Sequence, residues 1–158
     1  MRRLLPALAL LPLPAFAQVA QEIDVDEIEY CLAEVGYTGP ADPRRCIGFV
    51  ADSCQDSGGA GSAADCMTRE AAAWNEVAKR RVELLKQRSK QAVAEAVVAS
   101  QDSWTRYRDA QCGATGEFFF QYSGSAAAEW QAKCLRDAAA ERALLLDDWL
   151  TRSEDFVQ

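Results

Sequence analysis

Apolar residues recur at intervals of three and four along most of the chain, which is the spacing of one face of an α-helix. Residues 62–112 and 125–158 contain neither glycine nor proline and are rich in the helix formers Ala, Glu, Arg and Leu. No segment alternates apolar and polar residues in the way that a half-buried strand does. A first helical face is expected at Val25, Ile28, Cys31, Leu32 and Val35. The pattern therefore predicts an all-α protein.

Capping residues and breakers divide this pattern into helices. Asp42-Pro43 combines an N-cap with proline at the first helical position, which predicts the start of a short helix. Ser62 and Ser125 are expected to cap two longer helices, and the polar stretch 87–91 is expected to separate another two. We thus expect a small helical bundle with two short N-terminal helices and about three longer ones. The inward face of the last helix is expected to carry Trp130, Cys134, Ala138, Leu145 and Trp149.

The first 17 residues have the features of a secretory signal peptide. Arg2 and Arg3 precede a short apolar stretch, and Ala15-Phe16-Ala17 supplies the small-x-small pattern of a cleavage site. The stretch is shorter than the ~20 apolar residues that a membrane span needs. We expect cleavage near Ala17, a single domain over residues 18–158, no membrane insertion, and a periplasmic or secreted location.

All six cysteines lie beyond this leader: Cys31, Cys46, Cys54, Cys66, Cys112 and Cys134. An even number of cysteines in an exported chain predicts disulfides. The absence of a C-x-x-C spacing argues against a zinc or thioredoxin-like site. Six cysteines allow fifteen pairings, and nearest-neighbour pairing is favoured because each such pair flanks a glycine-containing turn. Three disulfides, each joining a local helical hairpin, are the prediction.

Composition narrows the classes of function. The chain has no histidine, which removes the commonest general base and the usual partner of a Ser or Cys nucleophile. Its 17 basic and 24 acidic residues give a formal net charge of -7, which argues against nucleic acid as a partner. We expect no catalytic residue, no metal and no cofactor.

Six carboxylates and no basic residue lie between residues 22 and 34. A run of charges is usually a solvated helix face, which is the first interpretation. The second is a docking surface for a cationic protein, since a patch of one sign attracts the opposite charge. The candidate residues of such a surface are Glu22, Asp24, Asp26, Glu27 and Glu29.

A run of aromatic residues lies in the glycine-rich segment between Cys112 and Cys134, which is expected to form a loop. Its members are Phe118, Phe119, Phe120 and Tyr122. We expect the loop to tuck these side chains under the bundle as a small satellite core. The alternative is an exposed aromatic contact surface, held in place by the disulfide at its base.

The most specific pattern is Gln101-x-x-Trp104-x-x-Tyr107-Arg108-Asp109-Ala110-x-Cys112. Trp104, Tyr107 and Ala110 are three residues apart and are expected to face the core together. Arg108 and Asp109 lie beside that face, where they can pair with the next helix or cap a carbonyl. We expect this charged pair to be structural rather than catalytic.

This segment resembles the W-x-x-[YF]-R-D-A-x-C motif of the lysozyme inhibitor LprI-like family of secreted and periplasmic proteins. The likeness continues at Gly124-Ser125, at Cys134-Leu135 and at Arg142-Ala143-Leu144, and upstream at Cys66-Met67 followed by Glu70 and Trp74. Ala139 departs from the family pattern, which usually has Thr just before the closing Arg.

The resemblance covers residues 31–150 and implies a non-catalytic protein that inhibits lysozyme, a cationic partner. The alternative function is a structural or interaction module of the cell envelope without lysozyme-inhibiting activity, because a fold does not fix a function.

Overall fold

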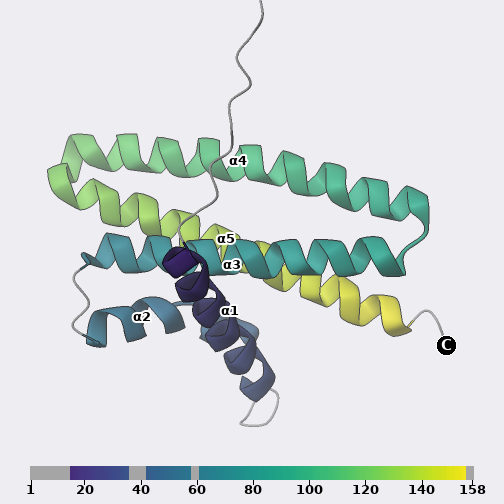
Figure 1. Ribbon diagram of the computed structural model, residues 1–158. Helices are drawn as coiled ribbons and strands as arrows, with labels where there is room; N and C mark the ends of the chain where they lie inside the picture. The colour runs from purple at the N-terminus through teal and green to yellow at the C-terminus, as the bar shows by residue number, and fades with distance from the viewer. Residues whose placement is uncertain (1–14, 36–41, 58–60, 156–158) are drawn as a thin grey trace, which may run out of the picture.

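The protein is a bundle of helices (Figure 1). The structure is a computed structural model that describes residues 15–35, 42–57 and 61–155, with side chains over 21–35, 42–57 and 61–153. Within these ranges the α-helices are α1 (Ala15–Val35), α2 (Phe49–Asp56), α3 (Ala63–Arg88), α4 (Gln91–Ser123) and α5 (Ala127–Asp155). Two 3-10 helices, η1 (Pro43–Cys46) and η2 (Gly124–Ala126), complete the described elements. The all-α prediction is confirmed, but the N-terminal part differs from the expected two short helices, because it consists of the long α1 followed by the short η1 and α2.

Three parts of the sequence-based picture lie outside the described residues. These are residues 1–14 of the expected signal peptide and, within the glycine-containing turns flanked by paired cysteines, residues 36–41 and 58–60. Among the helices described, none is both long enough and apolar enough to cross a membrane.

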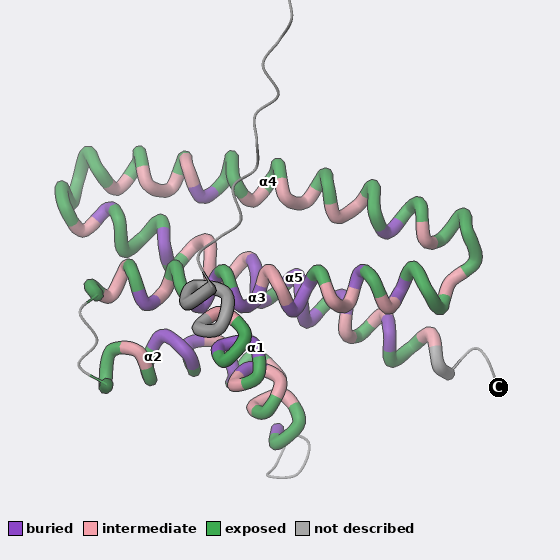
Figure 2. The backbone as a smooth tube through the Cα atoms, in the orientation of Figure 1, coloured by how far each residue is buried: buried purple, intermediate pink, exposed green. Residues whose placement is uncertain are grey.

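Helix α3 lies at the centre of the bundle and packs against α1, α2, α4 and α5. Its core face carries Trp74 and Val77, which meet Val25 and Ile28 of α1 in one cluster of buried residues. Figure 2 shows buried residues along α3 and α5 and on the inner sides of α1 and α2, whereas α4 is mostly exposed or intermediate. The predicted face of α1 is therefore confirmed, and α4 is an outer helix.

The inward face of α5 differs from the prediction. Trp130 is 45% exposed and Leu145 is 43% exposed, whereas Ala139, Ala140 and Ala143 are buried. Small side chains let α5 approach α3 closely, so the alanines occupy the interface together with the buried Leu146, and Trp130 and Leu145 lie at its edges. The expectation failed because α5 carries apolar residues on more than one face, and the largest ones were assigned to the core.

The expected helix ends are confirmed at three of four places. Ser62 begins α3 with a capping box, in which its hydroxyl accepts from Asp65 N–H at 3.2 Å and its own N–H donates to Asp65 Oδ2 at 2.8 Å. Asp42 caps η1, and residues 89–90 separate α3 from α4. Ser125 does not cap α5, because it lies inside η2 and α5 begins at Ala127. The chain reverses at Gly124, whose φ of 56° favours glycine.

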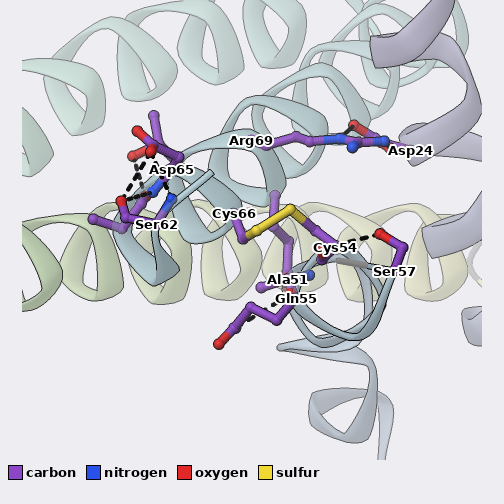
Figure 3. Close-up of a disulfide and its surroundings, with 12 residues drawn as sticks. Asp24, Ala51, Cys54, Gln55, Ser57, Ser62, Asp65, Cys66 and Arg69 are labelled. Carbon is purple, nitrogen blue, oxygen red and sulfur yellow. Dashed lines mark hydrogen bonds and ion pairs between the residues drawn. A yellow bond between two sulfur atoms is a disulfide. The ribbon is translucent and has the colours of Figure 1, made fainter. Parts of the chain in front are cut away.

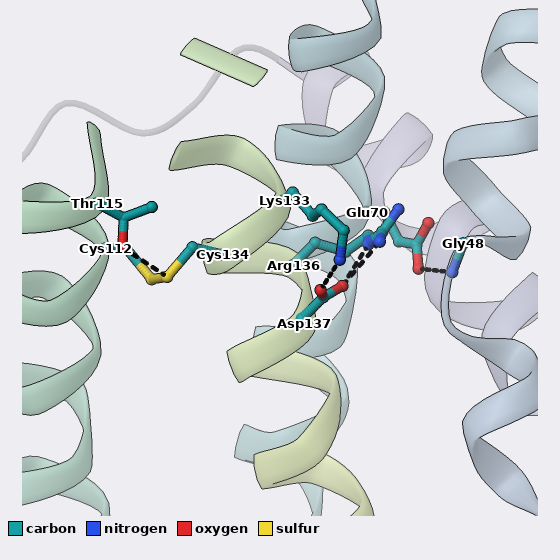
Figure 4. A network of polar contacts seen from close by, with 8 residues as sticks. All are labelled: Gly48, Glu70, Cys112, Thr115, Lys133, Cys134, Arg136 and Asp137. Carbon is teal, nitrogen blue, oxygen red and sulfur yellow. Dashed lines mark hydrogen bonds and ion pairs between the residues drawn. A yellow bond between two sulfur atoms is a disulfide. The ribbon is translucent and has the colours of Figure 1, made fainter. Parts of the chain in front are cut away.

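The three disulfides pair nearest neighbours, as predicted. Cys31–Cys46 joins α1 to η1, Cys54–Cys66 joins α2 to α3 (Figure 3), and Cys112–Cys134 joins α4 to α5 (Figure 4). All six cysteines are paired.

A buried carboxylate positions α2 and was not predicted from the sequence. Glu70 of α3 has 0% exposure, and its Oε1 accepts from Gly48 N–H at 2.7 Å (Figure 4) and from Trp74 Nε1–H at 2.9 Å. Its Oε2 accepts from Ala51 N–H at 2.8 Å. Gly48, the N-cap residue of α2, has no side chain to offer a hydrogen bond. Glu70 therefore caps α2 from the neighbouring helix.

Candidate functional site

Exposed aromatic side chains gather where α4 passes into α5. We call the cluster of Phe118, Phe119, Tyr122 and Trp130 the aromatic tip. Phe119 stacks on Trp130 of α5 with ring centroids 4.4 Å apart, and Phe118 contacts both Phe119 at 5.3 Å and Tyr122 at 4.9 Å. Phe118 is 57% exposed and Tyr122 is 72% exposed. The expectation of a buried satellite core is wrong, and the alternative of an exposed aromatic surface is what the structure shows.

The aromatic tip is helical rather than a loop. Gly113 and Gly116 predicted a loop, but both lie inside α4, which continues to Ser123. Gly116 has a packing reason, because a Cβ there would lie only 3.1 Å from Cδ of Gln131 and 3.3 Å from its Cβ on α5. The glycine thus permits the close approach of the two helices.

A disulfide joins the two helices that carry the aromatic tip. Cys112–Cys134 joins α4 and α5, and the Thr115 hydroxyl lies 3.9 Å from Cys134 Sγ (Figure 4). Phe120 extends from α4 on another side, is 67% exposed, and lines a shallow groove of about 460 Å³ together with Gln131. The tip is therefore a rigid helical hairpin that presents aromatic rings to solvent.

The acidic segment of α1 separates into structural and exposed carboxylates. Asp24 is buried and forms a two-pronged ion pair with Arg69 of α3 (Figure 3), with the second contact at 2.6 Å. Hydrogen bonding to Asp24 raises the pKa of the Arg69 guanidinium above its usual value. Glu29 pairs with Arg81 of α3. The placing of Asp24 on a docking surface is wrong, because its charge is buried and neutralised by Arg69.

The remaining acidic residues of α1 lie nearer to solvent. Glu22 and Asp26 are exposed, and Asp26 and Glu27 line a shallow groove of about 450 Å³ between α1 and α2. Its other lining residues are Ile23, Tyr30, Phe49 and Ser53. Glu22 and Asp26 therefore fit the first interpretation, a solvated helix face, and the docking surface stays a prediction.

The motif residues of α4 do not all face inward. Tyr107 is 64% exposed and Ala110 is exposed, so their placement in the core is wrong. Trp104 and Arg108, four residues apart, form the inner stripe instead, with the Arg108 guanidinium 5.0 Å from the centroid of the Trp104 ring. This stripe is narrow because α4 packs on the bundle as an outer helix.

The charged pair of the motif connects two helices. Arg108 Nη1 donates to Asn75 Oδ1 of α3 at 2.5 Å, and its Nε and Nη2 donate to Asp109 Oδ1 at 2.8 and 2.6 Å. The Arg108 side chain is 14% exposed, whereas that of Asp109 is 57% exposed. Arg108 thus joins α4 to α3, the preceding helix, rather than to the next helix, while Asp109 orients its guanidinium from the solvent side.

Arg142 of α5 completes the motif cluster and is 5% exposed. Its Nε donates to Gln101 Oε1 at 2.9 Å and its Nη2 to Ser100 Oγ at 3.0 Å. Its guanidinium lies 5.9 Å from the centroid of Trp104 and 5.5 Å from that of Trp149. Burial lowers the pKa of Arg142 from its usual value, since a desolvated cation is disfavoured.

Motif residues border a groove of about 640 Å³ between η1, α4 and α5, which we call the motif groove. Trp104 and Tyr107 line it from α4, Leu144 and Leu145 from α5, and Arg142 lies among them. Gly124 and Ser125, in contrast, lie at the turn between α4 and α5 and take no part in it.

Comparison with known proteins gives one match. The model of the family described as "Lysozyme inhibitor LprI" matches residues 52–146, which is more than half of the 158-residue chain. We found no match among curated proteins or among solved structures. The matched region runs from α2 through α3, α4 and the aromatic tip to most of α5. The chain belongs to the lysozyme inhibitor LprI family.

Proposed function

We propose that this protein is an exported, non-catalytic inhibitor of lysozyme and that the aromatic tip is its contact surface. The family match carries the proposal, because the matched region contains the whole tip and leaves α1 outside. Export through the leader of residues 1–17 would bring the chain to an oxidising compartment. Three paired disulfides suit such a compartment.

The aromatic tip has the physical properties of a binding hot spot. Aromatic side chains supply much contact area at a small cost in conformational entropy. Here the rings already contact one another, and the helices that carry them are joined by Cys112–Cys134. Because the surface is ordered before binding, little further entropy is lost when a partner covers it. We propose that the tip covers the sugar-binding cleft of lysozyme.

We propose that the negative charge of the protein speeds its association with lysozyme. Lysozymes that attack cell envelopes are commonly strongly cationic, whereas this chain has a formal net charge of -7. Glu22, Asp26 and Glu27 on α1 are exposed or half-buried and would attract such a partner. Steering of this kind weakens as salt rises, since the Debye length falls to ~10 Å at 0.1 M ionic strength.

The test is the turnover of cell-wall substrate by lysozyme in the presence of the purified protein. We expect micromolar protein to slow lysozyme at low salt. Phe118→Ala combined with Tyr122→Ala should weaken inhibition at least ~10-fold, the loss of about 1.4 kcal/mol of binding free energy. Tyr107→Ala is the matched control, because it removes an equally exposed ring from the same helix but away from the tip.

Three results are decisive. Lysozyme that is not slowed by the wild-type protein would refute inhibition and favour the envelope module. Inhibition that survives loss of the Phe118 and Tyr122 rings would refute the tip as the contact surface. Inhibition lost equally in the Tyr107 control would refute it as well.

A further inference from the structure

We propose that the motif groove binds a ligand through a terminal carboxylate and that Arg142 is the residue that recognises it. The ligand class is a peptide that ends in a free α-carboxylate with an apolar last residue. This site goes beyond the proposed function, because it lies away from the aromatic tip and takes a small ligand rather than lysozyme. Tyr107 and Phe118 are eleven positions apart on α4, which is ~16 Å along a helix.

The first observation is a buried charge without a counter-charge. Arg142 is 5% exposed and forms no ion pair with any carboxylate of the described residues. Its two hydrogen-bond acceptors, Gln101 and Ser100, are neutral. A buried charged side chain is normally paired, because removal of a charge from water costs several kcal/mol. Arg142 thus has the environment of a residue whose anionic partner comes from another molecule.

The second observation is that one guanidinium nitrogen of Arg142, Nη1, is available to donate a hydrogen bond. Nε and Nη2 donate to Gln101 and Ser100, whereas Nη1 donates to nothing among the described residues. No buried side-chain nitrogen or oxygen lacks a partner in that part of the chain. Nη1 of Arg142 is therefore accessible, and the space beside Arg142 is the motif groove. A carboxylate oxygen in the groove can accept from it.

The other charges at the groove are already paired. Arg44 Nε donates to Glu141 Oε1 at 2.8 Å, and Arg152 Nε donates to Asp148 Oδ2 at 2.7 Å. Neither pair includes Arg142, so of the two arginines that line the groove it is the one that no carboxylate of the described residues neutralises. An acidic protein thereby presents a local site for an anion.

The shape of the groove determines which anion fits. Its volume of about 640 Å³ lies within the ~300–1,000 Å³ that small-ligand sites occupy. Because so little of Arg142 is exposed, a carboxylate can reach it only from the end of a molecule. Trp104, Tyr107 and Leu145 supply flat and apolar walls for the side chain next to that carboxylate. The α-carboxylate of a peptide with an apolar last residue meets both conditions.

The test compares an acid with its amide on the intact wild-type protein. We would titrate acetyl-Ala-Phe and acetyl-Ala-Phe-amide and follow tryptophan fluorescence, since Trp104 lines the groove and Trp149 contacts Arg142. The acid should bind with millimolar or tighter affinity and at least ~10-fold more tightly than the amide. Acetyl-Glu-amide, which carries only a side-chain carboxylate, should bind less tightly than the acid.

Two variants locate the site. Tyr107→Ala should weaken binding of the acid several-fold, and Tyr122→Ala, which removes a similarly exposed ring at the tip, should leave it unchanged. Arg142→Lys keeps the charge and should lose the preference for acid over amide. If that variant does not fold, the wild-type comparison and Tyr107→Ala still decide the question.

Equal binding of acid and amide, no saturation by either, or full binding to Tyr107→Ala would overturn the proposal. None of these outcomes depends on whether the protein inhibits lysozyme.

Discussion

Replacement of Glu70 by glutamine tests the role of the buried carboxylate. Glu70→Gln preserves the shape of the side chain but turns one of its oxygens into an NH₂ group, which cannot accept a hydrogen bond. Oε1 accepts from Gly48 and Trp74, whereas Oε2 accepts only from Ala51. The glutamine therefore loses the fewest hydrogen bonds when its NH₂ group takes the place of Oε2. In that orientation the NH₂ group faces the Ala51 N–H, and neither group can accept a hydrogen bond from the other.

The magnitude follows from these contacts. An unsatisfied buried N–H at Ala51 costs ~1–3 kcal/mol, and the two remaining hydrogen bonds each lose ~1 kcal/mol when their acceptor becomes neutral. Neutralisation of the buried carboxylate, in contrast, stabilises the variant, because a buried charge no longer has to be kept away from water. That relief is small here, because three donors and the N-terminus of α2 already solvate the carboxylate. We expect a loss of about 3 kcal/mol in the free energy of unfolding and a fall of roughly 10 °C in Tm.

The assay is thermal and urea unfolding followed by circular dichroism. Glu76→Gln is the matched control on the same helix, because Glu76 makes only a 3.2 Å pair with the exposed Lys79. The control should change the free energy of unfolding by less than ~0.5 kcal/mol. A Glu70→Gln protein that unfolds like the Glu76 control would refute the account of how α2 is held.

Three further changes have defined outcomes. Gly113→Ala should stabilise the protein by ~0.5–1 kcal/mol in urea unfolding, because a Cβ there meets nothing within 4 Å and alanine favours the helix; destabilisation would contradict this. Hydrogen bonds from the backbone and hydroxyl of Ser62 lower the pKa of Asp65 in the folded protein. The Asp65 carboxylate therefore stabilises the folded protein at pH values above the pKa of the unfolded chain, and this stabilisation is lost as pH falls through the folded pKa. The Tm difference between wild type and Asp65→Asn should therefore shrink towards pH 3, and a constant difference would argue against this linkage. Replacement of both Cys112 and Cys134 by serine opens a loop with a sequence separation of 22 residues and should lower the free energy of unfolding by roughly 3 kcal/mol. At temperatures below the Tm of this variant, lysozyme inhibition should also weaken, because α4 and α5 are no longer joined next to the tip.

Gly116→Ala is the control for Gly113→Ala. Its Cβ would come within 3.3 Å of Gln131 Cβ, so the gain in helix propensity is offset by crowding between α4 and α5. Gly116→Ala should therefore be less stable than Gly113→Ala.

The features that the sequence predicts correctly are formed by residues that lie close together in the chain. Ser62 and Asp65 form their capping box within one helical turn, and the disulfides join cysteines that are near neighbours in the chain. The break at residues 87–91 follows from a polar stretch between two apolar patterns. In each case the residues that decide the structure lie close together in the sequence, so their chemistry can be recognised there.

The features predicted badly depend on packing between distant segments. Periodicity shows which residues of α4 share a face, but the orientation of that face depends on how an outer helix meets α3 and α5, and Tyr107 was misplaced for that reason. Glycine at 116 indicated a loop, whereas its role is to admit Gln131 of α5. The capping of Gly48 and Ala51 by Glu70 spans about 20 residues and leaves no local pattern.

The candidate site was predicted only in part. The aromatic run of residues 118–122 was identified from composition, but Trp130 joined it only through the pairing of α4 with α5. The motif was recognised as specific, yet the groove around Arg142 arises from three elements that converge in space. Arg142 follows Glu141 directly in the sequence, and nothing in that local pattern shows that the arginine is buried.

Hydroxyl-radical footprinting of the protein with and without lysozyme tests the central claim most directly, because it reports the solvent exposure of individual side chains. The account predicts that Phe118, Tyr122 and Trp130 lose reactivity in the complex, while the exposed ring of Tyr107 keeps it. Unchanged reactivity at the tip under conditions in which lysozyme is inhibited would contradict the account.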